Sequence, residues 1–204
     1  MDKQKADLVT MWPLEESVGL RDELLAAYAE PSRGYHNTQH LTEVLARLDE
    51  LADHGVSFDQ RVVRLAAWFH DSVYAGKPDD EEQSALWAQR ALSGLIPDHL
   101  IDEVARLVRL TKTHRPVDDD ANGSALCDAD LAILAAPPKR YAEYTQAVRV
   151  EYKHVRDPDF RAGRTQILRT LVDKPHLFHT DYAHKHWEDI ARANLERELA
   201  TLVS

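Results

Sequence analysis

Four side chains in this sequence have types and positions that suit a metal site in the protein interior. They are His40, the adjacent pair His70 and Asp71, and Asp130. Two imidazoles and two carboxylates suit one divalent ion of Mn, Fe, Zn, Ni or Co better than an oxygen-only site would, and Mg stays open because the ligand set does not name the metal. Four protein ligands on an octahedral ion leave positions for water and substrate. The pattern therefore predicts metal-assisted hydrolysis.

The pair His70 and Asp71 ends the central segment 59–74, which predicts a buried helix. Apolar residues recur there at helical spacing and form one stripe: Val62, Ala66, Phe69 and Val73. His70 falls inside this stripe, whereas Asp71 lies about 100° away from it. We therefore expect the imidazole of His70 to face the core.

A helix preceding the central one carries His40 on its apolar side. Asn37 or Thr38 is expected to cap this helix, which runs to about His54. Its buried face repeats at helical spacing: Leu41, Val44, Leu48 and Leu51. His40 is either a metal ligand or a core histidine with one hydrogen bond. His36 lies one turn earlier, in a loop that solvent or substrate can reach.

The segment 123–138 predicts a short helix that Pro137 and Pro138 end. Asp130 lies within its apolar stripe, and a buried carboxylate requires a hydrogen-bonding or ionic partner. A cation would supply that partner. Asp128 lies almost opposite on the helical wheel, and we expect it in solvent.

Two further residues are candidates for the same site. Glu81 shares a helical stripe with Ser84 and Ala88, so its carboxylate is expected to face inward, towards a metal or its water. His114 lies at the edge of the buried face of the helix that Pro97 opens. It would contact a phosphate, bind a second metal, or lie at a helix C-terminus that favours a partly cationic imidazole.

Three helices are expected to follow, over 138–155, 158–173 and 181 to the C-terminus. Arg149 and Arg164 are either anion contacts, since guanidinium matches phosphate bidentately, or structural residues, and Glu151 is a candidate partner for Arg164. Four histidines gather near the last helix without convergent carboxylates, and we interpret them as surface residues: His176, His179, His184 and His186.

Length and composition predict one all-α domain. The 204 residues allow a single core, and seven Gly and nine Pro favour a bundle of eight or nine helices over a many-turned β structure. The net charge of −10 argues against general affinity for nucleic acid polymers or anionic membranes. The lone Cys127, with no signal-peptide pattern and no apolar run of spanning length, predicts a reducing, cytoplasmic setting.

The order H…HD…D, present as His40, His70 with Asp71, and Asp130, resembles the HD superfamily of metal-dependent phosphohydrolases. Several strings extend the resemblance to a bacterial group of predicted HD-superfamily hydrolases along almost the entire chain: YHNTQHL, AAWFHDSVY, DDEEQSA, CDADLAILAAPPKRY, VRVEYKHV and ARANLERE. The resemblance implies an HD-type bundle over 1–204, with a metal-binding core at about 35–135 that helices in 138–204 complete.

The resemblance also implies roles for single residues. His40, His70, Asp71 and Asp130 would hold one divalent metal, and the substrate would be a small phosphorylated metabolite, often a nucleotide in relatives. Asp71 and Glu81 would orient the attacking water. Side chains at three further positions would contact the substrate: His36, His114 and Arg149.

Two other functions remain open from the sequence. One is a non-catalytic regulatory module that binds a metal and a nucleotide. The other is oxidative chemistry at a diiron centre, for which relatives use extra histidines between the HD pair and the last aspartate. His99 and His114 occupy that interval, but without a second HD or an adjacent His pair. A homodimer is an open alternative, by analogy with relatives alone.

Overall fold

The computed structural model describes residues 3–203, and every secondary-structure element named in this range is a helix. The elements in chain order are α1 (Lys3–Thr10), α2 (Val18–Tyr28), α3 (Thr38–Asp53), α4 (Gln60–Phe69), α5 (Asp80–Leu92), α6 (Asp98–Leu110), α7 (Ala121–Leu131), the 3-10 helix η1 (Ala132–Ala135), α8 (Pro138–Glu151), α9 (Asp157–Val172) and α10 (Asp181–Val203). The all-α prediction is confirmed. The ten α-helices in this range exceed the predicted eight or nine, and two of them, α1 and α2, lie before Pro31.

Local signals set the ends of the helices that carry the predicted site. The Asn37 side chain caps α3 by accepting hydrogen bonds from the backbone N–H groups of Gln39 and His40. This helix ends at Asp53 before Gly55, whose φ of 83° suits a residue without a Cβ. The Asp59 side chain caps α4 by accepting from the N–H of Val62.

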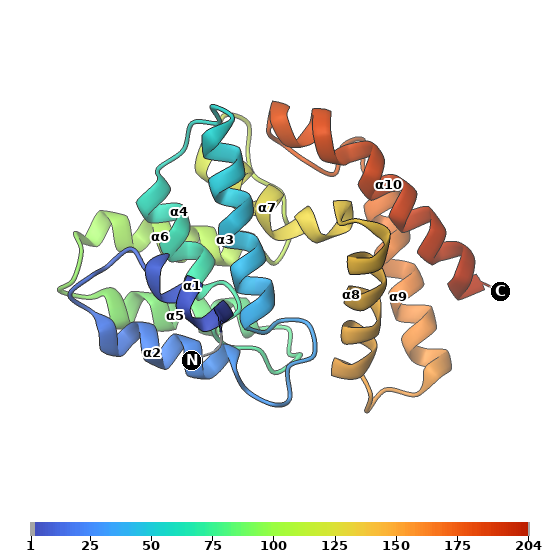
Figure 1. The fold of residues 1–204 in the computed structure, drawn as a ribbon, viewed down its shortest axis with the longest axis horizontal. Coiled ribbons are helices and arrows are strands. Elements are labelled where there is room, and N and C mark those ends of the chain that lie inside the picture. Colours follow the sequence, from blue (N-terminus) through green and yellow to red (C-terminus); the bar gives the residue numbers. More distant parts are fainter. Residues whose placement is uncertain (1–2, 204) are drawn as a thin grey trace.

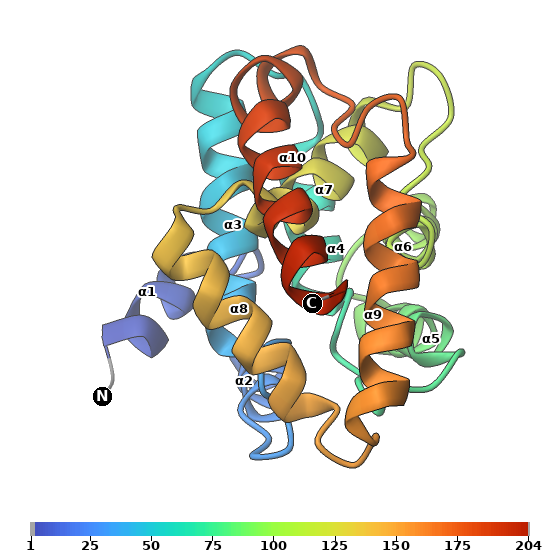
Figure 2. The ribbon, with the colours of Figure 1, turned by 90° about the vertical axis from the view of Figure 1, so that its right-hand side faces the viewer.

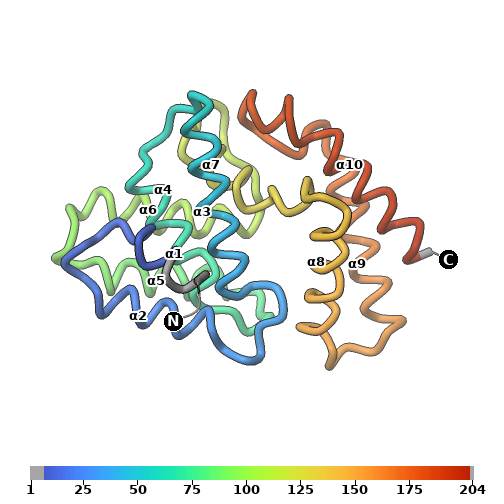
Figure 3. The backbone as a smooth tube through the Cα atoms, in the orientation of Figure 1, coloured from blue at the N-terminus to red at the C-terminus, as the bar shows by residue number. Residues whose placement is uncertain are grey.

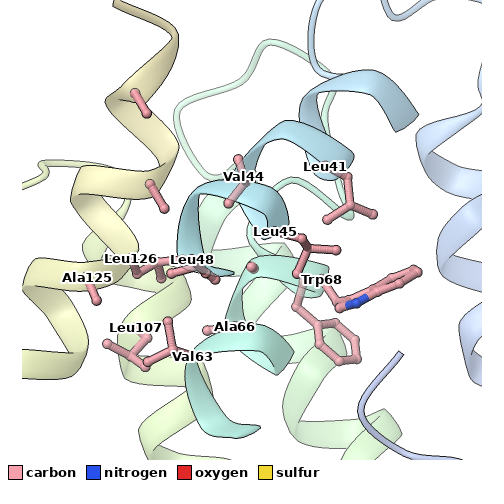
Figure 4. Close-up of a cluster of buried hydrophobic side chains, with 14 of the residues drawn as sticks. Leu41, Val44, Leu45, Leu48, Val63, Ala66, Trp68, Leu107, Ala125 and Leu126 are labelled. Carbon is pink, nitrogen blue, oxygen red and sulfur yellow. The ribbon is translucent and has the colours of Figure 1, made fainter. Parts of the chain in front are cut away.

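Helix α4 lies at the centre of the bundle, in contact with α3, α5, α6 and α7. Seven of its ten residues are buried, as expected for a helix that is covered on most sides. Figure 4 shows Val63, Ala66 and Trp68 of α4 among side chains of α3, α6 and α7. His70 follows directly as the helix C-cap, so the packing of α4 fixes where the HD pair begins.

The remaining helices extend this core on one side. In Figure 1, α1 to α6 lie on the left and α8 to α10 on the right, with α7 and η1 running between them. Figure 2 shows α8, α9 and α10 together on the face turned towards the viewer. One hydrophobic cluster includes residues from Leu8 to Leu195, in agreement with a single domain. Among residues 3–203, no helix combines the length and apolar character needed to cross a membrane.

The prediction that Asp128 lies in solvent is wrong. Its side chain is fully buried, and its two carboxylate oxygens accept hydrogen bonds from the backbone N–H groups of His179 (2.8 Å) and Thr180 (2.7 Å). Burial raises the pKa of Asp128 to about 6. Asp128 therefore ties α7 to the turn that precedes α10, a long-range contact that helical periodicity does not report.

Replacing Asp128 by Ala is expected to destabilise the protein by about 2–4 kcal/mol, because two buried N–H groups lose their acceptors. Urea denaturation followed by far-UV circular dichroism measures this loss. The matched control is Asp118→Ala at an exposed position, which should change stability by less than about 0.5 kcal/mol. Equal stability of the two variants would contradict the structural role of Asp128.

Candidate metal centre

Ligand atoms of His40, His70 and Asp71 form a buried group in which all three atoms lie within 4.8 Å of one another. His40 Nε2 is 3.0 Å from His70 Nε2 and 3.3 Å from Asp71 Oδ2, and His70 Nε2 is 3.0 Å from Asp71 Oδ2. Asp130 adjoins this group, with its Oδ1 3.2 Å from His40 Nε2 and 3.6 Å from His70 Nε2. The structure therefore brings together the four residues expected as metal ligands.

These separations match those of atoms that share one metal ion. Ligand atoms bonded at about 2.1 Å lie about 3.0 Å apart at right angles and about 3.4 Å apart in a tetrahedron. The measured separations run from 3.0 to 3.6 Å. The group His40, His70 and Asp71 could hold a metal ion, and mixed imidazole and carboxylate donors suit a first-row transition metal.

A backbone contact sets the tautomer of His70. Its Nδ1 lies 2.7 Å from the carbonyl oxygen of Ala67, which only accepts hydrogen bonds, so Nδ1 carries the proton. In the neutral ring, Nε2 then presents a lone pair towards His40, Asp71 and Asp130. Orientation of a ligating imidazole through its other nitrogen is usual in metal sites.

Electrostatics at the centre favour positive charge between the side chains. Burial disfavours ionised Asp71 and Asp130, but the facing imidazoles outweigh it and hold the pKa of both carboxyls well below the usual range. Burial likewise disfavours imidazolium, but the carboxylates outweigh it, so the pKa of His40 is raised and that of His70 is raised well above 6.5. Protons and a metal ion therefore compete for the same place.

Arg33 connects the loop that follows α2, which contains His36, to the loop that follows α4, which contains Asp71. Helical periodicity does not predict this role, because Arg33 lies outside the helices. Its guanidinium donates to the carbonyl oxygens of His36 (3.0 Å), Asp71 (2.6 Å) and Ser72 (3.0 Å). Arg33 as a whole is only 8% exposed. Tyr28 adds a contact, since its hydroxyl accepts from the N–H of Asp71 at 3.2 Å. Figure 3 shows the backbone of the loops after α2 and after α4 running close together on the side that faces α8.

The loop residue His36 is held by Glu151 at the end of α8. The Glu151 carboxylate accepts from the N–H groups of Tyr35 (2.9 Å) and His36 (2.8 Å) and contacts His36 Nδ1 at 2.8 Å. Gly34 permits this approach, because an added Cβ would collide with the carbonyl oxygen of Ala147. The expected pairing of Glu151 with Arg164 is wrong: Arg164 Nε donates to Glu198 at 2.7 Å.

A cavity of about 520 Å³ opens beside the candidate metal centre. Asp71 and Asp130 line it together with three other predicted site residues, His36, Glu81 and His114. His114 Nε2 lies 2.8 Å from Asp130 Oδ2, the oxygen remote from the two ligand imidazoles. Five of the predicted site residues thus line one cavity.

Glu81 and Arg149 lie differently with respect to this cavity. Glu81 Oε2 is buried without a hydrogen-bond partner among the described residues, and Lys112 Nζ lies 3.9 Å from it. The Arg149 guanidinium is occupied elsewhere, since it donates to Asp157 and to the carbonyl oxygens of Tyr152 and Val155. Arg149 is not among the cavity-lining residues, in keeping with the structural alternative for it.

The histidines near α10 are exposed as expected, but one carboxylate does converge on them. Ligand atoms of His176, His184 and Glu188 lie within 4.8 Å of one another. Glu188 already accepts hydrogen bonds from the N–H of Leu177 (3.0 Å) and from Arg192 Nε (2.7 Å). Its oxygens are thus less available to a cation than those of Asp71 and Asp130.

A comparison with protein-family models, curated proteins and solved structures finds no match to this chain. The function is therefore argued from the geometry of the site.

Metal binding is expected to strengthen as the pH rises, because both raised imidazole pKa values require proton loss before the nitrogens can bind. Calorimetric titration with Mn²⁺ or Zn²⁺ in buffers of different ionisation enthalpy should show release of about one or two protons per ion near pH 7. For each proton that the ion displaces, the apparent metal affinity should fall about tenfold when the pH is lowered by one unit. Affinity independent of pH between about 6 and about 8 would contradict this site.

Replacing Arg33 by Lys should weaken divalent-metal affinity by about 10–100-fold, since supporting contacts around metal ligands have effects of this size. Lys keeps the charge but cannot donate to three carbonyl groups in the same fork geometry. The control is Arg156→Lys, whose side chain is 82% exposed. Equal metal affinity in both variants, with circular dichroism spectra of the folded protein, would exclude a positioning role for Arg33.

Proposed function

We propose that this protein is a metal-dependent phosphohydrolase that acts on a small phosphorylated metabolite. The convergence of His40, His70, Asp71 and Asp130 at 3.0–3.6 Å beside the 520 Å³ cavity carries the proposal. These four residues would hold one divalent ion. The bundle would then be of the HD type that the sequence resembles.

The chemistry of the bound ion would be to lower the pKa of water and to polarise a phosphoryl oxygen. His70 and Asp130 contribute fixed geometry, because their other atoms are held by Ala67 and His114. This preorganisation means that little reorientation is needed when substrate enters the cavity.

Glu81 is suited to orient the attacking water and to take its proton. Its Oε2 lacks a hydrogen-bond partner among the described residues, and it lines the cavity together with Asp71. His36 and His114 also line the cavity, and their contacts with Glu151 and Asp130 each leave one ring nitrogen free among the described residues. In the imidazolium form that nitrogen could donate to a phosphoryl oxygen as negative charge develops. Glu151 would keep His36 in place by accepting from its Nδ1.

A second candidate function is oxidative chemistry at a dinuclear iron centre. The observation that favours it is that Asp130 has one oxygen near His40 and the other 2.8 Å from His114 Nε2, so its carboxylate has the form of a bridge. His99, the other histidine of that interval, is exposed and does not line the cavity. One additional imidazole is a small ligand set for a second ion, so we rank this function below hydrolysis.

Elemental analysis of tag-free protein, followed by phosphate release from a panel of phosphate esters, tests the proposal. Wild type should contain about one divalent ion per chain and release phosphate. His70→Ala and Asp130→Ala should lose metal and activity together. The loss should exceed the factor of about 10–100 that is typical when a residue supporting a metal ligand is replaced. His186→Ala, at an exposed position on α10, is the control and should match wild type.

Full activity in His70→Ala or Asp130→Ala would refute the site. About two irons per chain with oxygen consumption would favour the oxidative function instead. Tight nucleotide binding without turnover over a wide metal screen would indicate a regulatory module.

A further inference from the structure

The cavity beside the metal centre has a second wall that the proposed chemistry does not use. It is formed by residues of α8, α9 and the turn between them, and we call it the α8–α9 wall: Val148, Tyr152, Val155, Phe160 and Ile167. Ile167 is 55% exposed and lines the cavity, so its side chain offers apolar surface that a ligand in the cavity could cover. The cavity of 520 Å³ is far larger than one phosphate group requires.

The charges that line the cavity limit how many phosphates it can accept. Four carboxylates, from Asp71, Glu81, Asp130 and Asp159, face one guanidinium, from Arg164. Arg164 is itself neutralised by Glu198, whose oxygens lie 2.7 and 3.1 Å from it. With neutral histidines the lining has a formal charge of −3, and one divalent ion leaves −1. Asp159 is paired with Arg156 at 2.8 Å, and Arg164 is the one Lys or Arg among the described cavity-lining residues. A single phosphoryl group would be neutralised at the ion, whereas the further phosphates of a polyphosphate would find no free cationic side chain there.

The aromatic rings of the cavity argue against a cationic group on the substrate. A guanidinium already covers one face of three of them: Arg149 lies 4.8 Å from the Phe160 centroid, Arg164 lies 5.1 Å from that of Tyr144, and Arg33 lies 5.8 Å from that of Tyr74. These ring faces are therefore not free for a cation–π contact with an ammonium group of the substrate. A neutral ring or hydrocarbon group can instead pack against the apolar side chains of the α8–α9 wall.

We propose that the substrate is a phosphomonoester of an uncharged alcohol with a planar, largely apolar body, and that this body packs against the α8–α9 wall. This inference rests on the proposed hydrolysis. Water oxygen forms a bond to phosphorus as the bond from phosphorus to the alcohol oxygen breaks, and the proton lost by water ends on the alcohol. The products are inorganic phosphate and the free alcohol.

The test uses full-length protein reconstituted with Mn²⁺ and compares phosphate release from four compounds: phenyl phosphate, glycerol phosphate, phosphoethanolamine and tripolyphosphate. We expect kcat/KM for phenyl phosphate to exceed that for glycerol phosphate by about 10- to 100-fold, the effect of burying a ring. Ile167→Ala should reduce this ratio by about 3- to 10-fold. The matched control is Ile190→Ala on α10, 48% exposed and not among the cavity-lining residues, which should leave the ratio unchanged.

A binding measurement separates this inference from the proposed hydrolysis. Phenylphosphonate has no ester bond to cleave, and it should bind to the Mn²⁺ form about tenfold more tightly than methylphosphonate, with a smaller difference in Ile167→Ala. No phosphate release from any compound, together with this binding preference, would refute hydrolysis and keep the inferred ligand shape. Turnover with equal or better use of glycerol phosphate, phosphoethanolamine or tripolyphosphate would overturn the inference and keep hydrolysis. Equal binding of the two phosphonates would overturn it as well.

Discussion

The repulsion among converging lone pairs is the constraint on which this structure depends. His40, His70, Asp71 and Asp130 direct nitrogen and oxygen acceptors at one another across 3.0–3.6 Å, with both imidazoles almost fully buried. Such an arrangement needs positive charge at its centre, from protons or from a metal ion. Burial opposes the raised pKa values of both histidines and the lowered pKa values of both carboxyls, but the attraction between the facing imidazoles and carboxylates outweighs it.

The surroundings of the centre keep these groups from moving apart. Burial of α4 fixes His70, and the Ala67 carbonyl fixes its tautomer. The Arg33 guanidinium holds the carbonyl of Asp71, while Glu151 reaches from α8 to hold His36. The hydrogen bonds of Arg33 and Glu151 join segments far apart in the chain, so assembly of the site follows from the tertiary fold and not from any one helix. With these supporting contacts, the four side chains of the candidate centre could bind an ion without rearranging.

Helical periodicity accounts for what could be predicted from the sequence. His40 lies on the same face as Leu41 and Val44, so its burial on α3 follows from spacing alone, as does that of His70 on the strongly apolar α4. Asp128 was misplaced because α7 is short and covered on opposite sides, so the wheel identifies no solvent face there. Arg33 lies in a loop, where no period exists. The partners of Glu151 and Arg164 depend on how α8 packs against the α2–α3 loop and on where α10 ends, and neither is encoded locally.

The two sides of the cavity come from parts of the chain that are separate in sequence. The residues of the candidate metal centre lie between His40 and Asp130, whereas the apolar wall comes from α8, α9 and the turn between them. Under the proposed function, substitutions in that helix pair would alter the shape of the accepted molecule while leaving the four candidate metal ligands in place. A lineage carrying this fold would then acquire new substrate preferences by drift at exposed positions such as Ile167. Change at the candidate centre would have no such freedom, since each of its four groups lies within 3.0–3.6 Å of another and all depend on the same positive charge between them.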